Sequence, residues 1–438
     1  MASRKTHIQA HTGTFLRQGS LYDLGKIKAP LLRDYYQASC GIDGFLVSRG
    51  KVRLSLARIF IIKREGKMKI KKWIILAGIL GIILIVEFFS IGQARGDSDV
   101  KEIWSYKTDT TFSISVSEEG NLAFSEGTKK AGFMRIYNRK DNSLKSWKCS
   151  STQRVVVSGN YVFAAYNSNI SSLLQIKPSK QLWAKRVDSL NPSSLDYSNE
   201  AKCGVAGNIP VDSKGNLAAS TIWIFDQSGD ITWQKELNVF LTCAIINQKG
   251  YVVAAGEKFG PWDENFNCTK GENAVYVFDP SGKVLAHVQF ASPPIDVGID
   301  KYAERIAVGT DDGGMVFLNR NGKILWEKDD IGGYIAVDKE SERIATTKSV
   351  YLVLLNQKGK VLWESQQEVA GGIEGLVVSP NGKFVGISTF DSAVIILDAL
   401  NGKVLYQTKP GKKVSRISLS NSYAGVAIEG EIKLLSLK

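Results

Sequence analysis

The chain has 438 residues with 41 glycines and only 10 prolines, a balance that suits many tight turns rather than disorder. Its net charge of +13 is carried almost entirely by residues 1–72, which hold 16 basic and 4 acidic side chains. The remainder holds 40 basic and 39 acidic side chains. Because a neutral body lacks a broad phosphate-binding surface, we expect no nucleic-acid partner.

Residues 1–67 form a basic leader without clear hydrophobic periodicity. The sequence that begins at Met68, "MKIKKW", is typical of the start of an export signal. We therefore interpret 1–67 as a mis-called extension with the true start at Met68. The alternative is a disordered basic tail in the cytoplasm.

Residues 68–96 are predicted to form a transmembrane anchor. The apolar run 73–91 has 19 residues interrupted only by Glu87, close to the ~20 residues that cross a bilayer as a helix. Three lysines precede the run and two aspartates follow it, which places the N-terminus in the cytoplasm and the body outside. The alternative is a signal peptide cleaved after Ala94, which would make the body a secreted protein.

Residues 97–438 repeat one short motif at intervals of 36 to 53 residues. Its eight copies are "EIWSYK", "SLKSWKC", "KQLWAK", "DITWQK", "KVLAHV", "KILWEK", "KVLWES" and "KVLYQT". Each copy ends a unit that reads as four short strands, A to D, separated by glycine-bearing turns. A period near 40 residues with strand content is typical of a β-propeller, in which each repeat is one four-stranded blade.

The two ends of the repeat region are incomplete in complementary ways. Trp104 has no strands A to C before it, and residues 416–437 supply A to C without a strand D. We expect 103–106 to pair with 432–435 and to complete the last blade, which leaves no open sheet edge. The predicted fold is all-β, an eight-bladed propeller (seven blades being the alternative count) preceded by one transmembrane helix.

The segments "LDALNGKVLYQ" and "FDQSGDITWQ" resemble the repeat of pyrroloquinoline-quinone-type propellers, in which Asp-x-x-x-Gly-Lys-x-x-Trp closes each blade. The resemblance covers Trp104 to Lys438 and implies the architecture. WD-repeat propellers are the neighbouring alternative, but neither their Gly-His nor their Trp-Asp dipeptide recurs here. Because the tryptophan of strand D recurs in the repeat, we expect it to pack between neighbouring blades. The quinone dehydrogenases of this family place adjacent cysteines over the cofactor. This chain has no such pair, so we expect no cofactor.

Residues for catalysis are sparse. His7 and His11 lie in the leader and His287 stands alone on a strand, so zinc hydrolysis and histidine-based triads are unsupported. Asp311 and Asp312 are the obvious candidates for a glycosidase pair, although adjacent acids in "GTDDGG" more often form a solvated turn. We therefore assign no catalytic, cofactor-binding or metal-binding residue.

Propeller strands alternate in direction, so D–A and B–C connections lie at one end of the blades and A–B and C–D turns at the other. The two longest insertions, 187–202 and 257–273, are predicted at the first end, close in space. They bring Cys203 and Cys268 near each other, and we expect a disulfide between them. The pairing of Cys149 and Cys243 is left open.

The insertion 257–273 supplies the candidate binding loop. Its aromatic and acidic side chains suit a binding hot spot, although Trp262 could instead cap its own loop. These candidate residues are Trp262, Asp263, Glu264 and Phe266. Asn169 and Asn267 lie in glycosylation sequons.

The sequence thus favours a non-enzymatic binding or assembly platform outside the membrane, with another protein or a surface glycan as partner. The alternative is an exported enzyme, carbohydrate-active or a divergent quinoprotein, with its site in the central funnel. A funnel lined with converging acids would favour the enzyme, and one plugged by apolar side chains of strand A would favour the platform.

Overall fold

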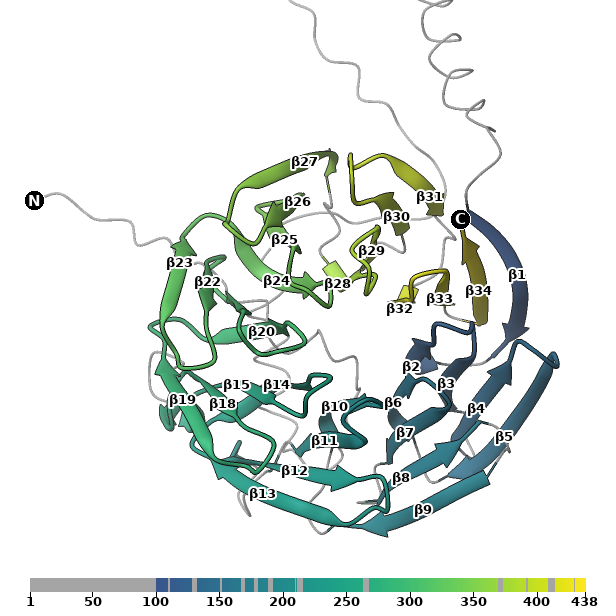
Figure 1. Cartoon of the computed structure of the whole chain (residues 1–438), viewed down its shortest axis with the longest axis horizontal. Helices are drawn as coiled ribbons and strands as arrows, with labels where there is room; N and C mark the ends of the chain where they lie inside the picture. Colours follow the sequence, from purple (N-terminus) through teal and green to yellow (C-terminus); the bar gives the residue numbers. More distant parts are fainter. Residues whose placement is uncertain are drawn as a thin grey trace, which may run out of the picture. The chain divides into compact units, whose positions relative to one another are not determined.

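The computed structural model describes residues 100–108, 111–127, 132–149, 152–166, 170–176, 180–187, 192–208, 210, 216–262, 268–368, 373–390, 393–408, 414–428 and 430–438. The leader 1–67, the predicted anchor, Asn169 and residues 263–267 lie outside them. The described part is an eight-bladed β-propeller, as the repeat predicts (Figure 1). Within it, no helix is long and apolar enough to cross a bilayer.

Blades 1 to 4 follow one another along the chain. Blade 1 consists of β2 (Thr111–Val116), β3 (Leu122–Gly127), β4 (Gly132–Asn138) and β5 (Ser143–Cys149). Blade 2 consists of β6 (Thr152–Ser158), β7 (Tyr161–Tyr166), β8 (Ile170–Gln175) and β9 (Lys180–Arg186). Blade 3 consists of β10 (Pro192–Ser198), β11 (Cys203–Asn208), β12 (Ser220–Asp226) and β13 (Ile231–Leu237). Blade 4 consists of β14 (Phe240–Ile246), β15 (Val252–Glu257), β18 (Ala274–Phe278) and β19 (Val284–Gln289).

Blades 5 to 8 complete the ring. Blade 5 consists of β20 (Pro294–Ile299), β21 (Ile306–Thr310), β22 (Met315–Leu318) and β23 (Ile324–Lys328). Blade 6 consists of β24 (Gly332–Val337), β25 (Arg343–Lys348), β26 (Tyr351–Asn356) and β27 (Val361–Glu368). Blade 7 consists of β28 (Ile373–Val378), β29 (Phe384–Thr389), β30 (Val394–Asp398) and β31 (Val404–Thr408). Blade 8 consists of β32 (Val414–Leu419), β33 (Tyr423–Ile428), β34 (Glu431–Leu437) and β1 (Val100–Lys107).

Blade 8 closes the ring with strands from both ends of the described chain. β1 pairs antiparallel with β34, with Val100 opposite Leu437 and Lys107 opposite Glu431, and the register shifts by one residue between Glu102 and Trp104. Figure 1 shows the two strands side by side. The predicted closure is confirmed, and every sheet is complete within residues 100–438.

The core is divided into eight apolar clusters, one at each joint between neighbouring blades. Because the second strand of each blade lies between two sheets, it is buried on both faces. β15 (VVAAGE) and β21 (IAVGT) show its composition, which combines small and β-branched residues. The fourth strand is the outer edge and alternates between exposed and half-buried side chains, as in β23.

The tryptophan of strand D docks on the C–D turn of the next blade. The indole N–H of Trp183 donates to the carbonyl of Gln227 (3.0 Å), and that of Trp363 donates to the carbonyl of Ala399 (3.0 Å). The indole ring lies against a turn glycine with positive φ, Trp183 against Gly229. The predicted packing between blades is therefore confirmed. At the joint of blades 4 and 5 Ala286 replaces the tryptophan, and Val288 helps to fill the space beside the glycine of the turn.

Candidate functional site: the two ends of the propeller

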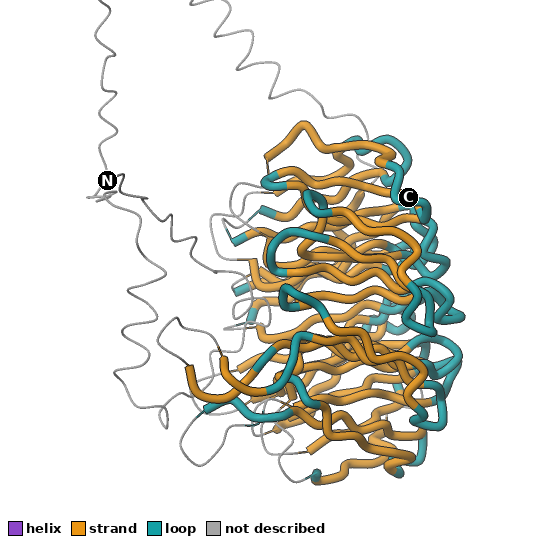
Figure 2. Tube along the Cα trace, turned by 90° about the vertical axis from the view of Figure 1, so that its left-hand side faces the viewer, coloured by secondary structure: helices purple, strands orange, loops and turns teal. Residues whose placement is uncertain are grey.

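The blades present two different ends to solvent. We call the end with the D–A and B–C connections the loop end, and the end with the A–B and C–D turns the turn end. Figure 2 shows short turns gathered at one end, together with the C-terminus. Since Val100 pairs with Leu437, β1 also begins at this turn end.

The insertion in blade 4 forms a small sheet of its own at the loop end. β16 (Phe259–Trp262) pairs antiparallel with β17 (Cys268–Lys270), and neither strand joins a blade. The buried side chain of Phe259 anchors the base of this hairpin, which we call the β16–β17 hairpin. Pro261 and Lys270 are exposed. The hairpin therefore offers strand edges and side chains that the propeller core does not use.

The B–C connection of blade 3 braces the β16–β17 hairpin. Leu217 forms an isolated bridge with Gly260, whose N–H donates to the Leu217 carbonyl at 3.0 Å. The residue that follows, Ala218, donates its N–H to Pro210 (3.1 Å) within the same connection. Two neighbouring blades thus build one raised feature. The contact of Leu217 with this hairpin was not predicted from the sequence.

The structure corrects the predicted insertion 187–202. Residues 192–198 are β10, the first strand of blade 3, and Leu195 and Tyr197 are buried. Consequently Cys203 begins β11 at the turn end, whereas Cys268 begins β17 in the hairpin at the loop end. A disulfide joins Cα atoms about 4.4–6.8 Å apart, while a six-residue strand spans roughly 17 Å or more. The Cys203–Cys268 bridge remains a prediction, and this placement does not favour it.

Only part of the predicted binding loop can be placed. The backbone of Trp262 lies at the end of β16, opposite Cys268. Asp263, Glu264, Phe266 and the sequon residue Asn267 lie outside the described residues. The site as described is therefore the stem of the hairpin.

Two carboxyl groups at the loop end lie in contrasting environments. Burial raises the pKa of Glu257 to about 7, and the negative charge of Asp311 adds to the shift. Asp312 accepts hydrogen bonds from the hydroxyls of Ser292 (2.6 Å) and Thr310 (2.6 Å), and these bonds help hold its pKa below the usual range. Asp312 therefore caps its own turn. The acid whose charge acts on Glu257 is therefore Asp311, at the end of the next blade's second strand.

The innermost strands carry polar side chains that are committed to the backbone of the next blade. Strand A has a sheet neighbour on one side only, so groups on its other edge need partners. The hydroxyl of Ser194 accepts from the N–H of Ala244 and donates to its carbonyl, both at 2.8 Å. Asp296 accepts from the N–H of Ile335 at 2.7 Å. These inner polar groups therefore link neighbouring blades.

Asp196, on β10, is another of these inner polar side chains, and it predicts how stability depends on pH. Its carboxylate accepts from the N–H groups of Ile246 (3.0 Å) and Tyr197 (2.8 Å), yet burial raises its pKa from 3.8 to about 6. The folded state binds a proton on Asp196 more tightly than the unfolded chain does, so protonation of this carboxyl stabilises the fold. This stabilisation is complete below pH ~3.8 and is lost as the pH rises through about 6. In the parent chain the free energy of unfolding should therefore fall between pH 4 and pH 7, and we expect this fall to be smaller by about 1–2 kcal/mol in Asp196→Asn. Urea unfolding at both pH values checks this, and an unchanged slope would contradict it.

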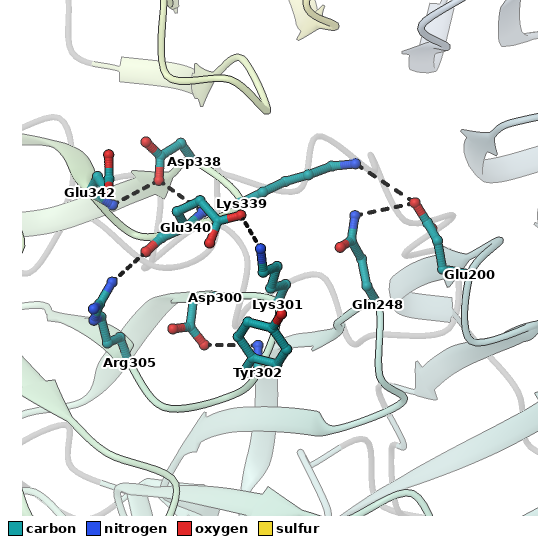
Figure 3. Close-up of polar contacts among 10 residues, drawn as sticks. All are labelled: Glu200, Gln248, Asp300, Lys301, Tyr302, Arg305, Asp338, Lys339, Glu340 and Glu342. Atoms are coloured by element: carbon teal, nitrogen blue, oxygen red, sulfur yellow. Dashed lines mark hydrogen bonds and ion pairs between the residues drawn. The ribbon is translucent and has the colours of Figure 1, made fainter.

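The turn end is held together by contacts between A–B turns (Figure 3). Lys301 of blade 5 pairs with Glu340 of blade 6 (2.5 Å), and Arg305 donates to the Glu340 carbonyl (2.8 Å). Asp300 accepts from N–H groups of its own turn, and Asp338 does the same in blade 6. These side chains therefore hold the A–B turns of blades 5 and 6 in place.

One pair at the turn end reaches across the ring. Lys339 of blade 6 approaches Glu200 of blade 3 with its ammonium 3.8 Å from the carboxylate. Gln248 of blade 4 donates to the same carboxylate oxygen at 3.2 Å (Figure 3). Because blades 3 and 6 are not neighbours, this pair crosses the axial region. Among the described residues, no cluster of three or more His, Cys, Asp or Glu could hold a metal ion.

Comparison with solved structures supports the architecture. No family model and no curated protein matches the sequence. Saccharomyces cerevisiae Sqt1 is similar with a TM-score of 0.57 and 11% identity over 76% of this chain and 98% of that one. The C-terminal WD40 domain of Sif2 is similar with a TM-score of 0.58 and 13% identity over 77% of this chain and 98% of that one. BamB from Moraxella catarrhalis is similar with a TM-score of 0.53 and 11% identity over 77% of this chain and 99% of that one. At this identity the likeness shows a β-propeller fold.

Proposed function

We propose that the chain is a membrane-anchored extracytoplasmic scaffold that binds another protein through the loop end of blades 3 to 5. The β16–β17 hairpin carries this proposal. It is braced from blade 3, it stands outside every blade, and the sequence of the insertion includes Trp262 and Phe266. Protein partners add to free strand edges, and aromatic side chains dominate binding energies.

The anchor 73–91 would tether the scaffold to the membrane, as the sequence predicts. The contrast between the two ends supports binding at the loop end. At the turn end, A–B turns of blades 3 to 6 use their charged side chains on each other. At the loop end, the hairpin leaves Pro261, Thr269 and Lys270 exposed.

Capture of the partner by the propeller tests this function. We expect a chain of residues 98–438 to retain a partner from a membrane extract, and a variant with 259–270 replaced by a short Gly-Ser linker to lose at least about 90% of it, since one hot-spot cluster dominates most interfaces. The linker is tolerable because β15 and β18 already pair, with Gly256 opposite Ala274.

The matched control replaces exposed lysines on outer strands, Lys145 and Lys235, with alanine. It should retain the partner in full. Equal capture by the linker variant, with its thermal unfolding unchanged, would contradict a partner site on the hairpin.

A further inference from the structure

Apolar side chains are exposed on the outer rim of the turn end. On blades 5 and 6, the first two residues of strand D are exposed: Ile324 by 48%, Leu325 by 46%, Val361 by 38% and Leu362 by 43%. Leu400, in the C–D turn of blade 7, is 74% exposed. Exposed apolar side chains grouped in this way mark interaction surfaces.

The docking of tryptophans makes these residues one surface. Trp326 follows Leu325 and donates to the carbonyl of Gln357 in the next C–D turn at 2.9 Å. Trp363 follows Leu362 and donates to Ala399, the residue before Leu400, at 3.0 Å. Each apolar pair therefore lies beside the turn of the next blade, and the surface runs over blades 5, 6 and 7.

Exposed lysines surround these apolar residues. They come from the three C–D turns: Lys323 in blade 5, Lys358 and Lys360 in blade 6, and Lys403 in blade 7. None of the four forms an ion pair within the described part of the chain. Of the nearby acids, Asp398 accepts the N–H of Leu400 at 2.7 Å, and Glu327 and Glu364 are exposed further along strand D, so that the four lysines outnumber these three acids. The rim patch, defined as these five apolar residues and four lysines, is thus cationic with an apolar centre.

The point where the chain enters the propeller indicates what covers the rim patch. β1 begins at the turn end, in blade 8, next to blade 7. Between the predicted anchor 73–91 and Val100 stand eight residues, 92–99, which reach at most about 29 Å. A bilayer that held the anchor would lie close to the turn end.

We propose that the rim patch is a second contact with the membrane, made to an anionic lipid surface. Lysines attract anionic headgroups, and leucine and isoleucine insert into the interface. The propeller then lies with its turn end on the bilayer and directs the β16–β17 hairpin away from it. The orientation rests on the proposed function, whereas the lipid contact belongs to a different surface.

Vesicle flotation with residues 98–438 tests the lipid contact without the anchor. We expect binding to vesicles of 70% phosphatidylcholine and 30% phosphatidylglycerol at 50 mM salt, and loss of binding to pure phosphatidylcholine or at 500 mM salt. Reversing Lys323, Lys358, Lys360 and Lys403 to glutamate should weaken binding at least about tenfold, and Leu400→Asp should weaken it severalfold.

The control reverses four exposed lysines elsewhere, Lys145, Lys148, Lys235 and Lys270, and has the same net charge. It should bind vesicles more tightly than the rim variant by at least about tenfold. Equal binding by the two variants, or no binding by the parent chain, would overturn the proposal. Binding to immobilised polyglutamate provides a second comparison. If the chain bound polyglutamate as tightly as vesicles, and Leu400→Asp did not weaken that binding, the proposal would be overturned in favour of an acidic protein as the partner. We expect partner capture to stay intact in the rim variant, so the two proposals can fail separately.

Discussion

A chain of residues 109–438, which lacks β1, is expected to lose the stable propeller that residues 98–438 form. Removal of β1 takes away the outer strand of blade 8 and the contacts of Trp104 with the joint to blade 1, where its ring stacks on Tyr137 at 4.2 Å. It also leaves β34 as an open edge. We expect a loss of at least about 5 kcal/mol, seen as a melting temperature lower by roughly 10 °C or as aggregation.

A peptide of residues 98–108 provides the control. Added in excess, it should restore the melting temperature of the 109–438 chain, since it supplies the missing strand and Trp104. A peptide with Trp104→Ala should restore less. Equal stability of the 98–438 and 109–438 chains would show that β1 does not close the ring.

Gly229→Ala is expected to cost about 2 kcal/mol more than Gly313→Ala. Both glycines have φ of +87°, so both substitutions carry the same backbone strain. At Gly229 a Cβ atom would lie 2.5 Å from the Trp183 ring, whereas at Gly313 nothing lies within 4 Å. The difference between the two variants therefore isolates the docking of the tryptophan on the turn.

Urea unfolding of the two variants measures this difference. Gly313→Ala is the matched control and should cost about 1 kcal/mol from its positive φ alone. Equal losses in the two variants would contradict a tight joint between blades 2 and 3.

The repeat was predictable because the same side chains make the same contact in most blades. The glycine of the C–D turn and the tryptophan of strand D meet across a joint, so both recur at a fixed spacing. Ring closure was predictable because 103–106 and 416–437 are each an incomplete blade. The joint with Ala286 could be assigned only by its position in the series.

Blade 3 was misread because its first strand is polar. In "PSSLDYS" only Leu195 and Tyr197 are apolar, since Ser194 and Asp196 point their polar groups at the backbone of β14. When the side chains of a strand form hydrogen bonds with the neighbouring blade, the strand is polar, and its sequence resembles that of a loop. The same error placed Cys203 at the loop end, whereas it begins β11 at the turn end.

The two proposals assign different tasks to the two ends. Short turns, tied together by Lys301, Glu340 and Lys339, make the turn end a rigid base. Longer connections at the loop end permit an addition such as the β16–β17 hairpin without loss of any blade strand. The proposed scaffold function depends on this division.

Site-specific photo-cross-linking in cells that make the full-length chain tests the central claim most directly. A photoreactive amino acid is placed at Pro261 or Lys270 on the hairpin, and at Lys145 or Lys235 on outer strands, all four of which are exposed. Partner binding at the loop end predicts one discrete protein adduct from the hairpin positions and none from the outer strands. The same adduct from the outer strands, with none from the hairpin, would contradict it.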